Sequence, residues 1–165
     1  MGKGIAIVGG LIAILLPILG YYVAFLGMWY SATSLGDSYG WIDVLGYYHV
    51  TSFDVTVVAD DAIQLVLILG IITLIGGAVV IFGGLAEKKS VVGVGVILIL
   101  VGAVIFAVLL PSILDDNPIA YVSNISLYFA VEEGILEVTQ LLGGGFWGAI
   151  IGAVIGLMGM TQLRK

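Results

Sequence analysis

Residues 115–134 read DDNPIAYVSNISLYFAVEEG and form the only long polar interruption in the second half of the chain. The stretch carries four of the eleven acidic residues and none of the five basic residues. It lies between two hydrophobic runs that are each long enough to cross a membrane, since about 20 apolar residues span the roughly 30 Å of hydrocarbon in a bilayer. A second polar segment, residues 29–61, interrupts the first half in the same way. The two segments therefore divide the chain into four apolar runs.

These runs predict a single integral membrane domain over residues 1–165. The predicted spans cover residues 5–28, 62–85, 91–114 and 135–161, with outer segments at 29–61 and 115–134 and a short turn at 86–90. Composition agrees with this, because 61% of the residues are hydrophobic and only 10% are charged, against about 25% charged in soluble domains. Pro17 falls inside the first run and is expected to kink that helix.

Both outer segments have the alternating pattern of strands. In the first, Phe53, Val55 and Val57 alternate with Asp54 and Thr56, and residues 119–129 alternate in the second. The predicted fold class is therefore a membrane all-α protein with a small β cap. It consists of a four-helix transmembrane bundle and an extracytoplasmic antiparallel sheet drawn from both outer segments.

The charges are distributed asymmetrically over this layout. The basic residues, which set the topology, all fall on one side: Lys3, Lys88, Lys89, Arg164 and Lys165. Ten of the eleven acidic residues fall on the other side, and Glu87 is the exception. Because Lys and Arg in short flanking segments stay in the cytoplasm, we expect a multi-pass protein of the cell membrane with both termini cytoplasmic.

Glycines recur at helical spacing within the spans. The predicted helix-packing residues are Gly144, Gly148, Gly152 and Gly156, spaced four apart, and Gly70, Gly77 and Gly84, spaced seven apart. Faces without side chains let helix backbones approach closely in membranes. This glycine zipper packs either within the bundle or against another subunit. The expected partners are the lipid bilayer and either further copies of the chain or other membrane proteins.

The sequence predicts no catalytic, cofactor-binding or metal site. The chain has no Cys, which removes thiol chemistry, and no basic stripe for nucleic acid. His49 is the only histidine and is expected to be packed or at the surface, although Ser52, His49 and Asp54 can be combined on paper into a triad. Clustered acids such as Asp60 and Asp61 leave cation binding as an alternative. Asn124 begins an Asn-Ile-Ser sequence and is a possible glycosylation site.

The spans themselves argue against several functions. Apart from Glu137 at the outer edge of the fourth run, they contain no Asp, Glu, Lys, Arg or His. Intramembrane ionisable residues mark ion pathways, proton relays and pumps, so a transporter, a pump and an intramembrane protease are disfavoured. We expect a non-enzymatic structural, adhesion or scaffold protein. The alternatives are an oligomeric channel or pore and a small accessory subunit of a membrane enzyme or respiratory complex.

The layout resembles the claudin and peripheral myelin protein 22 group of tetraspan proteins. It shares four spans with both ends inside, a longer first outer segment with several strands and a shorter second one. Trp29 precedes the first outer loop and Trp41 lies within it, with Gly40-Trp41 where the family has Gly-Leu-Trp, and the Cys pair of the family is absent. The resemblance implies the shape: a left-handed bundle with a sheet over its outer face.

Overall fold

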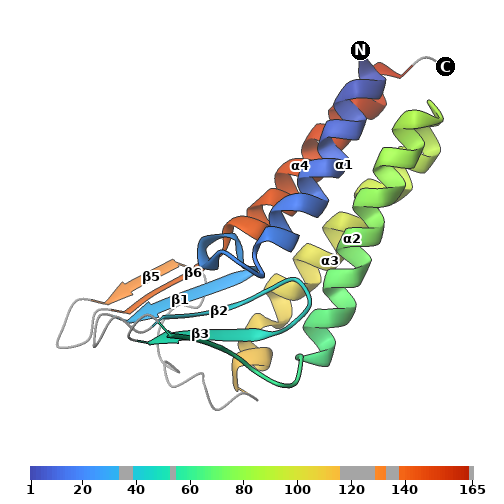
Figure 1. The fold of residues 1–165 in the computed structure, drawn as a ribbon. Coiled ribbons are helices and arrows are strands. Elements are labelled where there is room, and N and C mark those ends of the chain that lie inside the picture. The colour runs from blue at the N-terminus through green and yellow to red at the C-terminus, as the bar shows by residue number, and fades with distance from the viewer. Residues whose placement is uncertain (34–38, 53–54, 116–128, 133–137, 164–165) are drawn as a thin grey trace.

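The computed structural model describes residues 1–33, 39–52, 55–115, 129–132 and 138–163. Within these ranges the chain forms four long helices, α1 (Gly2–Leu19), α2 (Gln64–Leu85), α3 (Lys89–Asp115) and α4 (Gly144–Gln162). Each is long and apolar enough to cross a membrane. Helix α1 packs mainly against α4, α2 packs mainly against α3, and α1 also contacts α2 (Figure 1). The prediction of four apolar helices in one bundle is confirmed.

A six-stranded antiparallel sheet lies at one end of the helices (Figure 1). Its spatial order is β4-β3-β2-β1-β6-β5. The strands are β1 (Trp29–Thr33), β2 (Tyr39–Ile42), β3 (Tyr48–Ser52), β4 (Val55–Val58), β5 (Phe129–Glu132) and β6 (Val138–Leu142). The first four come from the first outer segment, as its alternation predicts. Of the strand predicted over residues 119–129, only Phe129 lies within the described residues, where it begins β5.

The predicted end of the first span is wrong. Helix α1 ends at Leu19 rather than near residue 28, and a single 3-10 turn, η1 (Ala24–Leu26), precedes β1. Pro17 lies in the last turn of α1 and not in the middle of a span. The residues that follow remain apolar but fold back beside the helix end. The approach is so close that a Cβ at Gly20 would collide with the backbone oxygen of Leu26. A hydropathy profile does not show such a reversal, because the residues before and after it are all apolar.

The predicted start of the fourth span is also wrong. Residues 138–142 form β6, which pairs with both β1 and β5, and α4 begins only at Gly144. The Gly143 and Gly145 amides donate hydrogen bonds to the Met28 and Gly27 carbonyls at 3.1 and 3.2 Å. These bonds fix the strand-to-helix transition, because they satisfy amides at the start of α4 that have no partner inside the helix.

The two ends of the bundle differ in their charges. Lys3 at the start of α1 lies 3.9 Å from Glu87 in the α2–α3 turn, so the N-terminus and this turn share the end opposite the sheet, where the end of α4 also lies (Figure 1). Both side chains are about half exposed, and such a surface pair contributes little to stability. The pair identifies which segments meet at this end.

Small residues bring the helix backbones together. A Cβ at Gly152 would lie 2.6 Å from the Gly9 oxygen and 2.7 Å from the Ala13 nitrogen of α1, and one at Gly148 would lie 2.6 Å from the Leu16 Cβ. The opposite surfaces of the helices carry exposed aliphatic side chains, among them Leu15, Ile68, Val108 and Ile151. Glycines thus lie at the closest contacts between the helices, and aliphatic side chains cover the outside of the bundle, as expected for helices that face lipid.

We predict that Gly152→Ala destabilises the bundle, because α1 and α4 must separate to admit the methyl group. Overpacking of this kind costs about 1–3 kcal/mol. Thermal unfolding in detergent, followed by circular dichroism, measures the loss. Gly4→Ala is the matched control, since nothing lies within 4 Å of a Cβ at Gly4. Equal stability of the two variants would contradict the close contact between α1 and α4.

Candidate functional site

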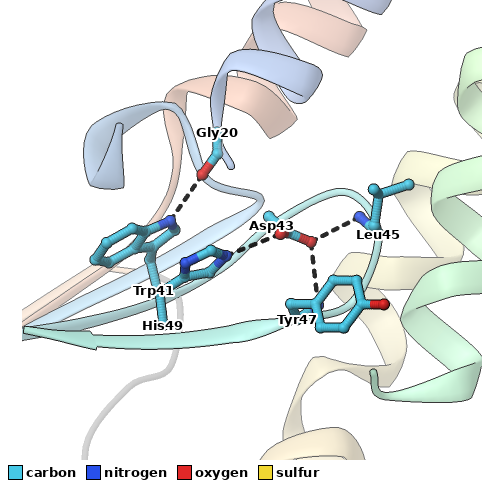
Figure 2. A network of polar contacts seen from close by, with 6 residues as sticks. All are labelled: Gly20, Trp41, Asp43, Leu45, Tyr47 and His49. Atoms are coloured by element: carbon cyan, nitrogen blue, oxygen red, sulfur yellow. Dashed lines mark hydrogen bonds and ion pairs between the residues drawn. The ribbon is translucent and has the colours of Figure 1, made fainter. Parts of the chain in front are cut away.

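Two buried polar side chains of the described chain, Asp43 and His49, lie where the sheet meets the helices, whereas Thr51 lies further along β3 and Thr73 lies inside the bundle. Asp43, directly after β2, is fully buried. Its Oδ1 accepts hydrogen bonds from the Leu45 amide at 2.8 Å and from the Tyr47 amide at 3.0 Å (Figure 2). The carboxylate therefore folds residues 43–47 into the turn between β2 and β3, a role that Asp takes readily because its side chain reaches backbone amides a few residues on.

His49 of β3 lies against the other carboxylate oxygen. Its Nε2 is 2.8 Å from Asp43 Oδ2, and its side chain is only 1% exposed. The Trp41 ring stacks on the imidazole with centroids 4.6 Å apart and planes 9° apart. The Tyr21 ring meets the imidazole edge-on at 5.2 Å. The imidazole is thus enclosed between two aromatic rings and one carboxylate. Figure 2 shows Trp41 and Asp43 on either side of this ring.

Trp41 connects this cluster to the end of α1. Its indole Nε1 donates a buried hydrogen bond of 2.7 Å to the Gly20 carbonyl (Figure 2). Carbonyls in the last turn of a helix lack partners within it, so the indole satisfies a group that would otherwise be orphaned. Strand β2 is thereby attached to the point where α1 stops.

The β2–β3 turn also packs against α2. A Cβ at Gly70 would collide with the Val44 carbonyl, and Val44 is almost fully buried. Gly46 has φ +83, which favours glycine, and a Cβ there would lie 2.7 Å from the Ile63 oxygen. The Gly46 carbonyl accepts a hydrogen bond from the Ile63 amide at 2.8 Å. Two glycines therefore let this turn lie directly on the start of α2.

An apolar groove of about 340 Å³ opens beside the cluster. It is lined by Ile18, Tyr21 and Tyr22 from the end of α1 and by Val44 and Leu45 from the turn. The aromatic residues Tyr21, Tyr22 and Trp147 are exposed near this end of the helices. The groove thus lies where the apolar helices give way to the sheet.

The arrangement is suited to holding structure rather than to chemistry. A general base must reach a substrate proton, whereas the Asp43–His49 pair is buried under aromatic rings. The acid beside His49 is Asp43. Asp54, the acid of the Ser52–His49–Asp54 combination considered from the sequence, lies outside the described residues. Within the described ranges, no group of three His, Cys, Asp or Glu residues is placed to hold a metal ion.

The structure brings some sequence-predicted residues together and leaves others apart. Gly144, Gly148 and Gly152 face η1 and α1, Gly156 faces Val80 and Val96, Gly77 and Gly84 face α1, and Gly70 faces Val44. These contacts are all within the chain. Lys3, Lys88 and Lys89 lie at the end opposite the sheet. Arg164, Lys165 and Asn124 lie outside the described residues.

Sequence reasoning missed the Trp41–Asp43–His49 cluster. A signal was present, because residues 41–50 read WIDVLGYYHV and contain the turn-forming residues Asp43 and Gly46 between two strand-like runs. In the structure Trp41 pairs with His49. A turn centred on residues 44–46 would have paired Trp41 with His49, but it would not have placed the Asp43 carboxylate against the imidazole.

No family model matches the chain, and no curated protein matches it significantly.

We predict that Asp43→Ala and His49→Ala each destabilise the sheet by roughly 3–5 kcal/mol, the cost of leaving a buried charged or polar partner unpaired. Asp43→Asn is the matched control, because its amide oxygen still accepts from the Leu45 and Tyr47 amides. Urea unfolding in detergent and protease resistance of the sheet measure the effect. If Asp43→Ala unfolded no more readily than Asp43→Asn, the cluster would not hold the turn.

Burial raises the pKa of the Tyr48 hydroxyl to about 12, from its ordinary value of 10.0. The neutral hydroxyl is therefore favoured in the folded state, so the stability it contributes is complete below pH 10 and is lost as the pH rises toward 12. The loss is at most about 3 kcal/mol. We expect Tyr48→Phe to lose less stability than the parent chain between pH 10 and 12, measured by urea unfolding. Parallel pH profiles would contradict the burial of this hydroxyl.

Proposed function

We propose that the chain is a non-enzymatic four-span membrane protein that holds a β-sheet platform outside the lipid for contact with other proteins. The observation that carries this proposal is the separation of polar and apolar groups. The sequence contains no Asp, Glu, Lys, Arg or His between residues 4 and 36, 62 and 86, or 90 and 114, nor within α4. The four helices thus offer lipid an uninterrupted apolar surface.

The sheet provides what the helices lack. Its junction with the bundle is fixed by the Asp43–His49 pair, the Trp41–Gly20 hydrogen bond and the Val44–Gly70 contact. A sheet attached in this way can present a recognition surface, since binding sites are commonly positioned by a rigid scaffold. A buried cluster with no access for substrate favours a scaffold over an enzyme.

The charges support one orientation of this platform. Lys3, Lys88 and Lys89 lie at the helix ends away from the sheet, and basic flanking residues stay in the cytoplasm. In the proposed orientation the sheet faces the outside of a cell membrane. The resemblance to the claudin group remains a prediction about this shape.

Single cysteines test the orientation cleanly because the chain has none of its own. Ser90 in the turn region and Asp60 beside the sheet are both exposed. We expect Asp60→Cys to react with a membrane-impermeant maleimide in intact cells, and Ser90→Cys to react only after the membrane is opened. Reaction of both variants in intact cells would remove the proposed orientation.

Cysteine scanning along α2 separates a platform from a pore. Ile68, Ile75 and Phe82 are more than half exposed on the outside of the bundle, and in the proposed function they face lipid. We expect cysteines at these positions to resist a charged, water-soluble thiol reagent, with Ser90→Cys in opened membranes as the reactive control. A water-accessible row along one helix face would favour an oligomeric pore instead. Migration with a large complex on native gels would favour an accessory subunit.

A further inference from the structure

Strand β4 (Val55–Val58) forms one edge of the sheet. It pairs with β3 on one side, and no described strand pairs with it on the other. An open edge presents unpaired backbone groups to any extended chain, and proteins commonly blunt such edges with Lys, Pro or a covering element. The β4 sequence, VTVV, contains neither Lys nor Pro. The sequence of β4 therefore lacks the residues that commonly prevent another strand from adding to an edge.

The hydrogen-bond register identifies which amides face the open side. The Ala59 amide donates to the Tyr48 carbonyl at 2.8 Å, and His49 pairs with Val58 in the same ladder. Hydrogen-bonded and non-hydrogen-bonded pairs alternate in antiparallel ladders, so Val57 and Val55 bond to β3. The backbone N–H and C=O groups of Thr56 and Val58 point away from it. The 2.7 Å contact between the Thr51 and Thr56 hydroxyls fits the closer side chains of a non-hydrogen-bonded pair.

Apolar side chains accompany this open edge. Val55 and Val57 are each 62% exposed, and Val50, which pairs with Val57, is 36% exposed. Recognition by strand addition uses main-chain hydrogen bonds for affinity and contacts to alternate side chains for specificity. Strand β4 offers both, with valines on one face and a threonine on the other.

The charges around β4 select the occupant. Asp54 precedes the strand in the sequence, the exposed Asp60 and Asp61 follow it, and no Lys or Arg occurs between Lys3 and Lys88. A second copy added antiparallel would bring acid beside acid, and like charges that face each other across strands are destabilising. An anionic lipid surface would be repelled for the same reason. A strand with basic ends is complementary to this edge.

We propose that the β4 edge binds an extended segment of a partner protein, with a β-branched core and Lys or Arg at its ends, as an added antiparallel strand. This deepens the proposed function, on which it rests, by naming the class of partner that the platform takes. The bound segment would bond to the Thr56 and Val58 amides and carbonyls and place its basic ends near the acids that flank β4.

Peptide binding to the full chain in nanodiscs of zwitterionic lipid tests the proposal. The probe is a fluorescent peptide, Lys-Lys-Val-Thr-Val-Thr-Val-Lys-Lys, and its twin carries Glu in place of every Lys. We expect saturable binding of the lysine peptide that weakens as salt is raised, and at least tenfold weaker binding of the twin. Equal binding of the two peptides would overturn the proposal.

Val58→Pro tests the strand addition itself. Proline is tolerated on an edge strand where its nitrogen faces away from the ladder, so this variant loses an outward donor and keeps the bonds of β4 to β3. We expect it to bind the lysine peptide at least tenfold more weakly, whereas Val58→Thr, which keeps the amide, binds like the parent chain. Circular dichroism verifies that both variants fold. Unchanged binding by a folded Val58→Pro variant would overturn the proposal.

Charge reversal gives a second test that does not depend on proline. We expect the double variant Asp60→Asn, Asp61→Asn to weaken binding of the lysine peptide roughly three- to tenfold, the range for two exposed ion pairs. The double variant Asp60→Lys, Asp61→Lys should favour the glutamate twin. An unchanged preference would overturn the role of these acids in the proposal.

Cross-linking tests the rival occupant. Formation of disulfide dimers by Val58→Cys chains in liposomes would show that a second copy occupies the β4 edge. The proposal would then be wrong. The cysteine labels at Ser90 and Asp60 keep the two proposals distinguishable. If the two cysteines are labelled from opposite sides of the membrane but the peptide does not bind, only the proposed class of partner is wrong. If both cysteines are labelled from the same side, the proposed orientation is wrong.

Discussion

The carboxylate of Asp43 is the group on which the placement of the sheet depends. Burying a charge costs several kcal/mol unless it is paired and hydrogen-bonded. Here two backbone amides and the His49 imidazole offset that cost. The amides close the β2–β3 turn, and the imidazole orients β3 beneath Trp41. Because the Trp41 indole in turn bonds to the Gly20 carbonyl, one buried carboxylate links turn, strand and helix end.

A different physical regime governs the helices. Lipid tails are as apolar as Leu or Val, so burying such side chains between helices gains little in a bilayer. Helices α1 and α4 associate through close backbone approach at Gly9 and Gly152, where a methyl group would collide with the facing helix. Helices α2 and α3 approach in the same way at Thr73 and Gly102, with the Thr73 hydroxyl bonded to its own helix at Leu69. The protein thus combines polar attachment at one end with close backbone contacts at glycines along the helices, between which side chains such as Phe106 and Ile99 are also buried.

Strand alternation and hydropathy predicted the four helices and the strands of the first outer segment, because each pattern repeats over many residues. The same measures failed at two boundaries. Residues 20–28 and 135–143 are largely apolar but not α-helical in their described parts, since the first folds back at Gly20 and the second pairs as β6 with β1. An apolar strand and an apolar helix end have the same hydropathy. Their difference lies in which distant backbone groups accept their amides.

What the sequence by itself determined is which segments avoid water and which carry charge, because the cost of placing ionisable groups in lipid is local to each residue. The sequence alone therefore predicted four apolar helices, glycine rows at helical spacing and basic residues flanking one set of helix ends. Only the tertiary structure decided that Asp43 is the partner of His49, that Trp41 bonds to the end of α1, and that β4 is the edge of the described strands. Each of these depends on groups brought together from separate elements, whose hydrogen bonds exist only once the chain has folded.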